Sequence, residues 1–335
     1  MSDPRLDAIR DLIQQDVGNR GLRTDPASNL ITATLSDFEA ACRSIAEAAA
    51  PSVAVVTGFY IPHAQPPCGE TDGPLGAVFL ARALVPLGIK VVLATDDFCL
   101  PALEVGVALC GLRKEVPLVR LPSAEEAGSL SGGDYRQMFA ERTGPLTHLI
   151  ALERVGPSHT PESLRAQGSS EAAVEQFRRE VPAEHHDRCH TMRGRDITAS
   201  MSPAHRLFEG AGPIRTIGIG DGGNEIGMGK VPWDVIRRNI PGGGLVACRV
   251  PCDYLIVCGV SNWGAYGLAA GVRLLRGAPP EPELFDVERE RELLRMLVER
   301  GPLVDGVSGQ PTVSVDGLEF ERYAEPLRQL ATILR

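Results

Sequence analysis

Residues 53–57 read VAVVT and residues 90–95 read KVVLAT, two short apolar runs rich in β-branched residues. Runs of the same character occur at residues 116–121 and 148–152. Each run has the length of one strand, and nearly continuous apolar character is typical of a parallel sheet that is covered on both faces. The sequence therefore predicts a block of four buried parallel strands.

The same alternation of strand and helix extends outward from this block. Helical patterns follow at residues 75–84 and 101–112, further strands are predicted at 214–219 and 255–260, and helices at 286–300 and 318–334. We predict an α/β fold with a mostly parallel, Rossmann-like layered sheet and helices on both faces. Ligands of such sheets bind at the carboxyl ends of the strands.

Two segments lie outside this alternation. Residues 1–50 form a helical lead-in, with helices at 6–13 and 37–48, which we interpret as a cap or as the contact of a homo-oligomer. Residues 51–335 are predicted to form a single α/β domain, and we favour an arrangement of this domain in two lobes. Within it, the polar stretch 155–213, with a helix at 171–179, is interpreted as a lid or insertion over the site.

Composition limits the classes of partner. The 335 residues carry 43 acidic and 34 basic side chains, a net charge of −9, which disfavours binding to nucleic acid or to anionic membranes. Eight cysteines are too sparse for a disulfide scaffold and are expected to be reduced thiols. The first residues contain no apolar signal stretch, and the apolar runs are shorter than the ~18 residues of a membrane span, so we expect a cytoplasmic protein that acts on a small molecule.

The loop at residues 218–229, GIGDGGNEIGMG, is the most informative candidate site. Six of its twelve residues are glycine, so the backbone can approach a ligand closely, and Asp221, Asn224 and Glu225 provide polar groups. Its GxGxxG spacing is a weak dinucleotide signal, because the loop is acidic where a pyrophosphate would lie. The alternative is a glycine-rich turn that its own Asp and Asn cap.

Two further loops follow predicted strands. Residues 69–76, GETDGPLG, place Glu70, Thr71 and Asp72 where they could bind an ammonium group or a metal, although either Thr71 or Asp72 could instead cap a helix. After the strand at 148–152, Glu153 could take a proton or an amine while Arg154 binds a carboxylate bidentately; a surface ion pair is the alternative.

A fourth loop, at residues 257–264, offers hydrogen bonds from Ser261 and Asn262. Gly264 is predicted to begin a helix of small residues whose amino end could hold an anion. Asp305 lies in a late loop and is available to the site. A zinc site around residues 185–190 lacks a second ligand pair, and no serine-hydrolase elbow is present.

Four of these segments together resemble the D-glutamate cyclase C-terminal domain family: ALERVGP (151–157), GIGDGGNEIGMG (218–229), CGVSNWGAYGLAAGV (258–272) and GETDGPLGA (69–77). The resemblance extends from about residue 6 to the end of the chain. It implies a hydro-lyase that converts D-glutamate to 5-oxo-D-proline and water.

The resemblance also implies roles for the candidate residues. The base would be Glu225 or Asp221, and Glu70 would protonate the leaving oxygen. The amides of Gly222 and Gly223 would stabilise an oxyanion, and the α-carboxylate would be held by Arg154 and Asn262. The complete predicted site comprises the catalytic residues Glu70, Glu153, Asp221 and Glu225 and the substrate-binding residues Thr71, Asp72, Arg154, Gly222, Gly223, Asn224, Ser261 and Asn262.

Other functions are compatible with the same loops. The acidic excess would suit a divalent cation such as Mg²⁺ or Mn²⁺, as in a metal-dependent enzyme acting on another small carboxylate. A non-catalytic sensor of an amino acid or nucleotide would use the same groups without turnover. A nucleotide-dependent enzyme is a third possibility.

Overall fold

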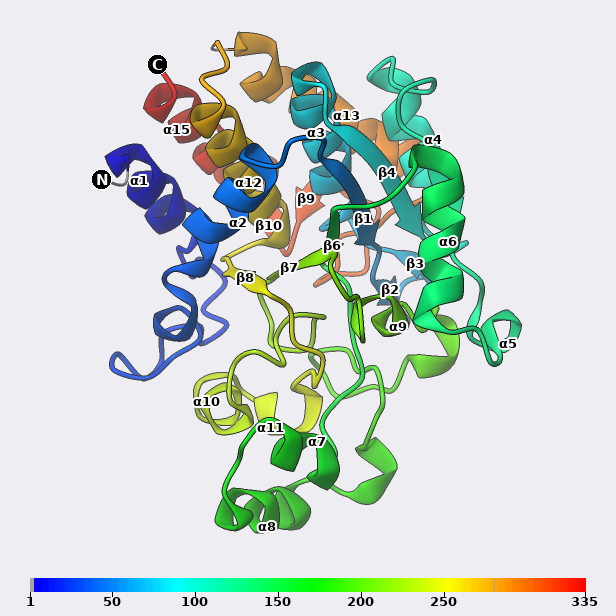
Figure 1. Ribbon diagram of the computed structural model, residues 1–335, viewed down its shortest axis with the longest axis vertical. Coiled ribbons are helices and arrows are strands. Elements are labelled where there is room, and N and C mark those ends of the chain that lie inside the picture. Colours follow the sequence, from blue (N-terminus) through cyan, green and yellow to red (C-terminus); the bar gives the residue numbers. More distant parts are fainter. Residues whose placement is uncertain (1–2, 280) are drawn as a thin grey trace.

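The protein is built on one six-stranded sheet, seen in a computed structural model that describes residues 3–279 and 281–335 (Figure 1). Its strands are β1 (Ser52–Thr57), β4 (Lys90–Thr95), β5 (Leu118–Arg120), β6 (His148–Leu152), β7 (Arg215–Gly220) and β8 (Tyr254–Val257). They lie in the order β5-β4-β1-β6-β7-β8, and every neighbouring pair is parallel. Along the chain, β4 and β5 are added on one side of β1, and β6, β7 and β8 are then added on the other side. The connections that follow β1 and β6 therefore diverge, and a crevice opens beyond the carboxyl ends of these two strands.

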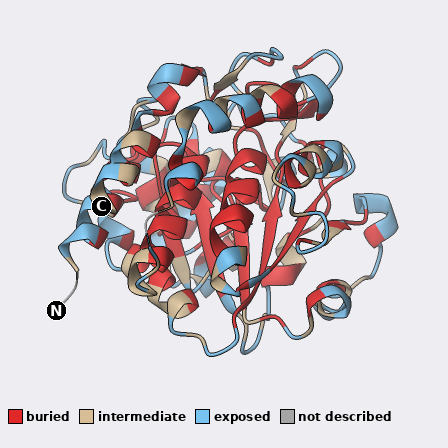
Figure 2. Ribbon diagram, turned by 90° about the horizontal axis from the view of Figure 1, so that it is seen from above, coloured by how far each residue is buried: buried red, intermediate tan, exposed pale blue. Residues whose placement is uncertain are grey.

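Both faces of the sheet are buried, as the apolar strand sequences predict. In β1, Val53 and Val55 contribute to one hydrophobic core, and Ala54 and Val56 to another on the opposite face. Successive side chains of a strand point to opposite faces, so a strand covered on both sides must be apolar at every position. Figure 2 shows the buried strands enclosed between layers of helices.

Each face is covered by its own set of helices. The core containing Val53 is completed by α1 (Pro4–Ile13), α2 (Asp37–Ala46), α3 (Pro74–Leu84), α4 (Leu100–Leu109), α12 (Ser261–Leu275), α13 (Val287–Arg300), α14 (Phe320–Tyr323) and α15 (Glu325–Ile333). The core containing Ala54 is completed by α5 (Ala124–Ala127), α6 (Gly132–Thr143), α8 (Glu171–Glu180), α9 (His205–Phe208), α10 (Trp233–Asn239) and neighbouring loops. The predicted α/β class with helices on both faces is confirmed.

Most element boundaries agree with the sequence patterns, and the strands at residues 90–95 and 148–152 are confirmed without change. Several other boundaries differ by a few residues. The helix predicted to begin at Gly264 begins at Ser261, and the strand before it ends at Val257 rather than at residue 260. The segment 318–334 is divided into strand β10 (Leu318–Glu319) and helices α14 and α15.

The polar stretch 155–213 lies beyond the carboxyl ends of the strands, together with residues 221–250. It contains α7 (Pro161–Ala166), α8 and α9, while α10 and α11 (Gly243–Val246) come from the connection between β7 and β8. Backbone hydrogen bonds join the two segments, from Gly156 N to Asn224 O (3.0 Å) and from His159 N to Ala247 O (3.2 Å). In Figure 1 these segments form the lower part of the molecule. The region below the sheet is therefore built from two connections, the one between β6 and β7 and the one between β7 and β8, and not from residues 155–213 alone.

Two small hairpins complete the surroundings of the crevice. Strand β2 (Tyr60–Ile61) pairs with β3 (Cys68–Gly69), and β9 (Ser314–Val315) pairs with β10. Glu70, directly after β3, forms a bridge with Val304, which joins the first loop to the C-terminal segment. The two hairpins therefore bring residues far apart in the sequence to the same end of the sheet.

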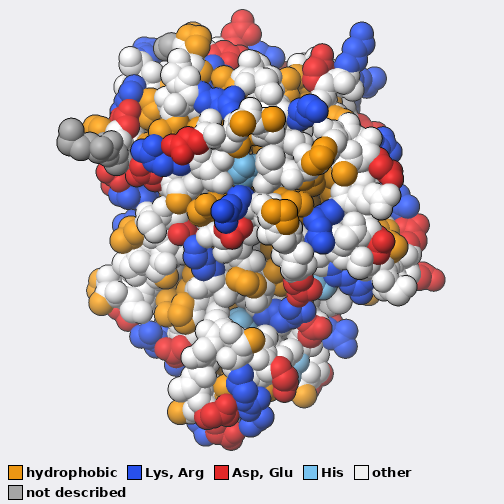
Figure 3. All heavy atoms as spheres, viewed as in Figure 1, with side chains coloured by type: hydrophobic (Ala, Val, Ile, Leu, Met, Phe, Trp, Pro, Cys, Tyr) orange, Lys and Arg blue, Asp and Glu red, His pale blue; other side chains and the backbone are white. Residues whose placement is uncertain are grey.

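The visible surface carries charges of both signs. Acidic and basic side chains are interspersed over the face shown in Figure 3. None of the helices within residues 3–279 and 281–335 combines the length and apolar character required to span a bilayer.

Candidate active site

A cavity of about 460 Å³ opens beyond the carboxyl ends of the parallel strands. Its size falls within the range of about 300–1,000 Å³ that is usual for small-molecule sites. Glu70 comes from the loop after β1, Glu153 follows β6, and Asp221 and Asn224 follow β7. The structure thus brings these four predicted residues to one cavity. Its other walls come from residues 17–20, 59–63, 191–193, 306–307 and 316–318.

A second cavity, of about 640 Å³, is larger but lies elsewhere. Residues 273–274, 277–279 and 281–282, at and beyond the carboxyl end of α12, line it together with the last helix. The predicted site residues lie near the amino end of α12, so we place the chemistry in the smaller cavity, where buried ionisable groups converge.

Three carboxyl groups of the cavity are almost completely buried. Glu70, Glu153 and Asp221 are only 5%, 6% and 1% exposed. Burial raises the pKa of each one well above its usual value, and neighbouring carboxylates raise it further. Within the described residues, Asp221 Oδ2 has no hydrogen-bond partner. The cavity therefore holds carboxyl groups that can retain protons near neutral pH, beside an oxygen free to accept a ligand proton.

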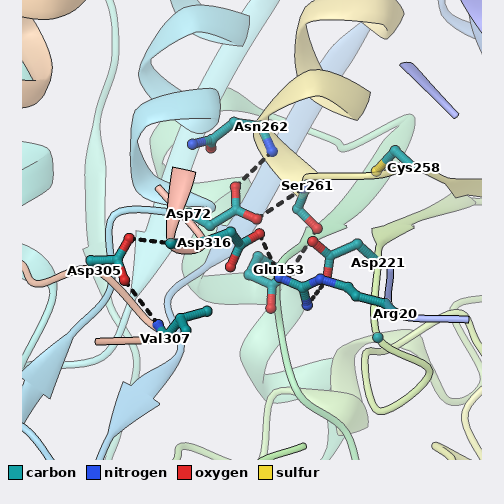
Figure 4. Close-up of polar contacts among 12 residues, drawn as sticks. Arg20, Asp72, Glu153, Asp221, Cys258, Ser261, Asn262, Asp305, Val307 and Asp316 are labelled. Carbon is teal, nitrogen blue, oxygen red and sulfur yellow. Dashed lines mark hydrogen bonds and ion pairs between the residues drawn. The ribbon is translucent and has the colours of Figure 1, made fainter. Parts of the chain in front are cut away.

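Arg20 is the cation of this cluster, and sequence reasoning did not identify it. Its guanidinium lies 2.8 Å from Asp221 Oδ1 and 2.7 Å from Asp316 Oδ2, between the two carboxylates (Figure 4). Burial opposes its charge, but Asp221 and Asp316 outweigh burial and raise the pKa of Arg20. Arg20 therefore stays charged and favours the ionised form of Asp221.

The segment that carries Arg20 has no regular secondary structure and is held by one carboxylate. Asp16 accepts hydrogen bonds from the backbone amides of Arg20, Gly21 and Leu22 at 2.8–3.0 Å. Gly21 has a φ of 96°, a conformation that favours glycine. A local Asp-x-x-x-x-Gly turn of this kind is a signal that could have drawn attention to the neighbouring arginine.

Glu153 is held in a strained backbone conformation. Its φ is 45°, in the left-handed region that non-glycine residues rarely occupy, and Ser261 Oγ donates to Glu153 Oε2 at 2.5 Å. Such strain costs on the order of 1–3 kcal/mol and is concentrated at functional sites. The strain directs Glu153 into the cavity, whereas the next residue points the other way.

Arg154 does not line the cavity, which contradicts the predicted role in binding a carboxylate. It is completely buried and forms an ion pair with Asp96. Its terminal nitrogens also donate to the carbonyl oxygens of Gly58 (3.2 Å) and Ser202 (2.9 Å). Glu153 and Arg154 are not a surface pair either, because successive side chains here face opposite directions and find separate partners.

Glu225 does not fit its predicted role as the base. Its carboxylate accepts the backbone amides of Asp221, Gly222 and Gly223 at 2.6–2.8 Å. The same bonds occupy the amides of Gly222 and Gly223, which were predicted to stabilise an oxyanion. Glu225 instead shapes the loop that positions Asp221, as the alternative of a self-capped turn implies.

The amino end of α12 is occupied by a buried carboxyl group of the protein. Asp72 accepts the amides of Ser261 (2.9 Å) and Asn262 (2.7 Å), as Figure 4 shows, and the amide of Gly73 (3.1 Å). The sequence predicts that this helix end could hold an anion, but the amides of Ser261 and Asn262 already donate to Asp72. Asp72 thus caps a helix, which is one of the alternatives given for this loop. The helix it caps is α12, whose first residue, Ser261, is 189 positions away in the sequence.

Asn262 and Thr71 stabilise the first loop and do not line the cavity. Asn262 Oδ1 accepts the amides of Gly73 (2.9 Å) and Gly76 (2.8 Å), and Thr71 Oγ1 donates to Ser314 O (2.9 Å). Ser261 uses its hydroxyl on Glu153. The predicted substrate-binding roles of these three residues are replaced by positioning roles.

The C-terminal loop brings Asp316 to the cluster. Asp305 accepts hydrogen bonds from Val307 N, Ser308 N, Ser314 Oγ and Gly317 N at 2.7–3.1 Å, so it organises the loop and does not face the cavity (Figure 4). Asp316 has a φ of 54° at the resulting turn. Gly306 lies so close to Glu70 that a Cβ there would be 1.8 Å from Glu70 Oε2.

Two sets of carboxylate oxygens lie close enough together to hold a cation. Asp72, Asp221 and Asp316 form one, and Glu153, Asp221 and Glu225 the other, each with oxygens within 4.8 Å of one another. All are hard oxygen donors of the kind that Mg²⁺ and Mn²⁺ prefer. Asp221 belongs to both sets and carries the unpartnered oxygen.

Comparison with known proteins shows the family of the chain. A family model described as "D-glutamate cyclase-like, C-terminal" matches residues 9–177 and 178–331. The chain belongs to this family. The human protein named "D-glutamate cyclase, mitochondrial" is 29% identical over 365 aligned positions, which cover 98% of this chain and 52% of the human protein. The chain thus spans about half the length of that relative.

Proposed function

We propose that the protein is a D-glutamate cyclase, which closes D-glutamate to 5-oxo-D-proline and releases water. The observation that carries the proposal is the cluster of buried Glu70, Glu153 and Asp221 around Arg20 in one cavity. It is supported by membership of the D-glutamate cyclase-like family and by the name of the human relative.

The reaction requires two protons to move from nitrogen to oxygen. Asp221 in its ionised form, which the ion pair with Arg20 favours, accepts the first proton of the substrate ammonium group, and Glu70 protonates the side-chain carboxylate. The amine then forms the new C–N bond. One of the two protons left on the nitrogen passes to Glu70 and the other stays on the ring nitrogen; Asp221 returns its proton to the hydroxyl group, and the C–O bond breaks to release water. Both side chains end in their starting states.

Glu153 faces the same cavity and orients the amine. Its carboxylate is fixed by Ser261, and the strained backbone directs it toward Asp221, with which it shares one of the candidate cation sets. A second carboxylate beside the ammonium group holds the nitrogen in line for attack.

The proposal is tested by measuring 5-oxoproline formation in Asp221→Asn and Glu70→Gln variants. We expect turnover to fall by about 100- to 10,000-fold in each, because each loses its proton-transfer group. Asp97→Asn is the matched control, since Asp97 also follows a strand but is exposed and outside the cavity. Wild-type turnover in Asp221→Asn would contradict the assignment.

We also propose that the cluster accepts a divalent cation such as Mg²⁺ or Mn²⁺. Asp221 and Asp316, with Asp72 or Glu153, would hold it, and the ion would polarise the substrate carboxyl group. Titration of the wild-type chain with MnCl₂ should raise its melting temperature, and Asp221→Asn should abolish the rise. Full activity after exhaustive chelation would exclude the requirement.

Binding without turnover is the second candidate function. The human relative contains almost as much chain again outside the matched region, and ring closure in that protein can depend on residues there. Calorimetry combined with a product assay separates the two functions: saturable binding of D-glutamate without 5-oxoproline would indicate a sensor.

A further inference from the structure

The cavity has opposite charges at its two ends. Glu70, Glu153 and Asp221 form its buried inner wall. At the mouth lies Arg193, which is exposed and lines the same cavity. Arg20 cannot balance both ends, because Asp221 and Asp316 already occupy its guanidinium.

Arg193 is positioned but not neutralised. It lies on a tight turn in which Thr191 N donates to Arg195 O (2.9 Å) and Gly194 N donates to Thr191 O (2.8 Å). Its Nη2 donates to Val307 O at 2.8 Å, which anchors the side chain across the cavity mouth. Within residues 3–279 and 281–335, Arg193 takes part in no ion pair, so its charge is available to a ligand.

The orientation of a bound amino acid follows from this separation. An ammonium group is stabilised by the inner carboxylates, and Asp221 Oδ2 is a buried acceptor that has no partner among the described residues. Ring closure also requires the side-chain carboxyl group near Glu70. The α-carboxylate is the one charged group of glutamate that takes no part in the reaction, and it is left at the mouth.

We propose that Arg193 binds the α-carboxylate of an amino-acid ligand whose amine faces Asp221. This inference rests on the proposed use of the cavity and adds the substrate class, an α-amino acid rather than a simple amine. An arginine with free N–H groups can bind a carboxylate bidentately, which a lysine cannot reproduce.

The test compares ligands that differ only in the α-carboxylate. Calorimetry would measure the affinity of D-glutamate and L-glutamate against 4-aminobutanoate, and of D-aspartate against 3-aminopropanoate, for the wild-type full chain and Arg193→Gln. We expect Arg193→Gln to weaken binding of the amino acids about 10- to 100-fold. Binding of the matching amines should change less than about twofold, and Arg193→Lys should recover only part of the loss.

Arg195→Gln is the matched control. Arg195 lies on the same turn and is equally exposed, but its guanidinium donates to Pro62 O and does not line the cavity. Equal losses in Arg193→Gln and Arg195→Gln, or equal weakening of amino acids and amines, would overturn the inference. So would the absence of binding by every amino acid tested.

Failure of this inference is distinguishable from failure of the proposed cyclase. Arg193-dependent binding of an amino acid without 5-oxoproline formation would support the inference and reject the cyclase. Turnover of D-glutamate with unchanged affinity in Arg193→Gln would do the reverse.

Discussion

Arg20 and Arg154 are both arginines that meet aspartates beside the same crevice, yet they serve different purposes. Arg154 is completely buried, and its ion pair with Asp96 joins the loops after β6 and β4. Arg20 keeps 21% of its side chain exposed and lies between two carboxylates that border the cavity. A charged residue at a strand end, such as Arg154, can therefore be part of the scaffold, while the cation of the cavity, Arg20, comes from an irregular segment.

The largest expected effect concerns the scaffold arginine. Arg154→Met should lower the free energy of unfolding by about 3–5 kcal/mol, because it leaves the Asp96 carboxylate buried without its cation. Urea unfolding measures the change. An Arg154→Met/Asp96→Leu double variant is the control, and it should recover part of the loss because no buried charge remains. A loss below about 1 kcal/mol in the single variant would show that the pair is not structural.

The next effect concerns turnover rather than stability. Arg20→Gln should reduce 5-oxoproline formation about 100-fold, equivalent to roughly 2.7 kcal/mol, because Asp221 loses the cation that favours its ionised form. Raising the pH should restore part of the activity, since Asp221 then ionises without help. If Arg20→Gln instead unfolds as readily as Arg154→Met, the distinction between the two arginines disappears.

The smallest effect is a dependence of stability on pH. The pKa values of Glu70, Glu153 and Asp221 are raised by burial, so the folded chain keeps protons that the unfolded chain has already lost. Below about pH 4 the three groups are protonated in both states, and their contribution to the free energy of unfolding is complete. As the pH rises toward the folded pKa values, the free energy of unfolding falls by about 1.4 kcal/mol per pH unit for each retained proton. Urea unfolding between pH 5 and 8 should show this fall.

A Glu70→Gln/Asp221→Asn double variant should flatten that fall, because two of the three proton-binding groups are gone. Asp97→Asn, which changes an exposed carboxyl group outside the cavity, should leave the slope unaltered. A slope that persists unchanged in the double variant would assign the retained protons to other groups.

Local patterns predicted the sheet well because a strand buried on both faces must be apolar at every position. β4 and β6 were predicted without error for this reason. The start of α12 was predicted three residues late, since its cap is Asp72, a residue from a distant loop. Such a partner leaves no trace in the neighbouring sequence.

The structure brings four of the predicted site residues to one cavity and places the others outside its lining. Glu70, Glu153, Asp221 and Asn224 do line one cavity, because parallel strands deliver their following loops to the same edge. Which side of a loop faces the ligand depends on backbone details such as the positive φ of Glu153, which also turns Arg154 away. The turn at residues 16–21 marks the segment of Arg20, but its pairing with Asp221 could not be inferred, because the two residues are 201 positions apart.

The dependence of the site on Arg20 has a practical consequence for recombinant work. A shortened version that starts at β1 would retain every strand of the sheet and all the acidic loops, but it would lack the guanidinium between Asp221 and Asp316. In such a fragment the carboxylates of Asp221 and Asp316 would repel each other. We therefore expect it to be unsuitable for activity assays or inhibitor screening.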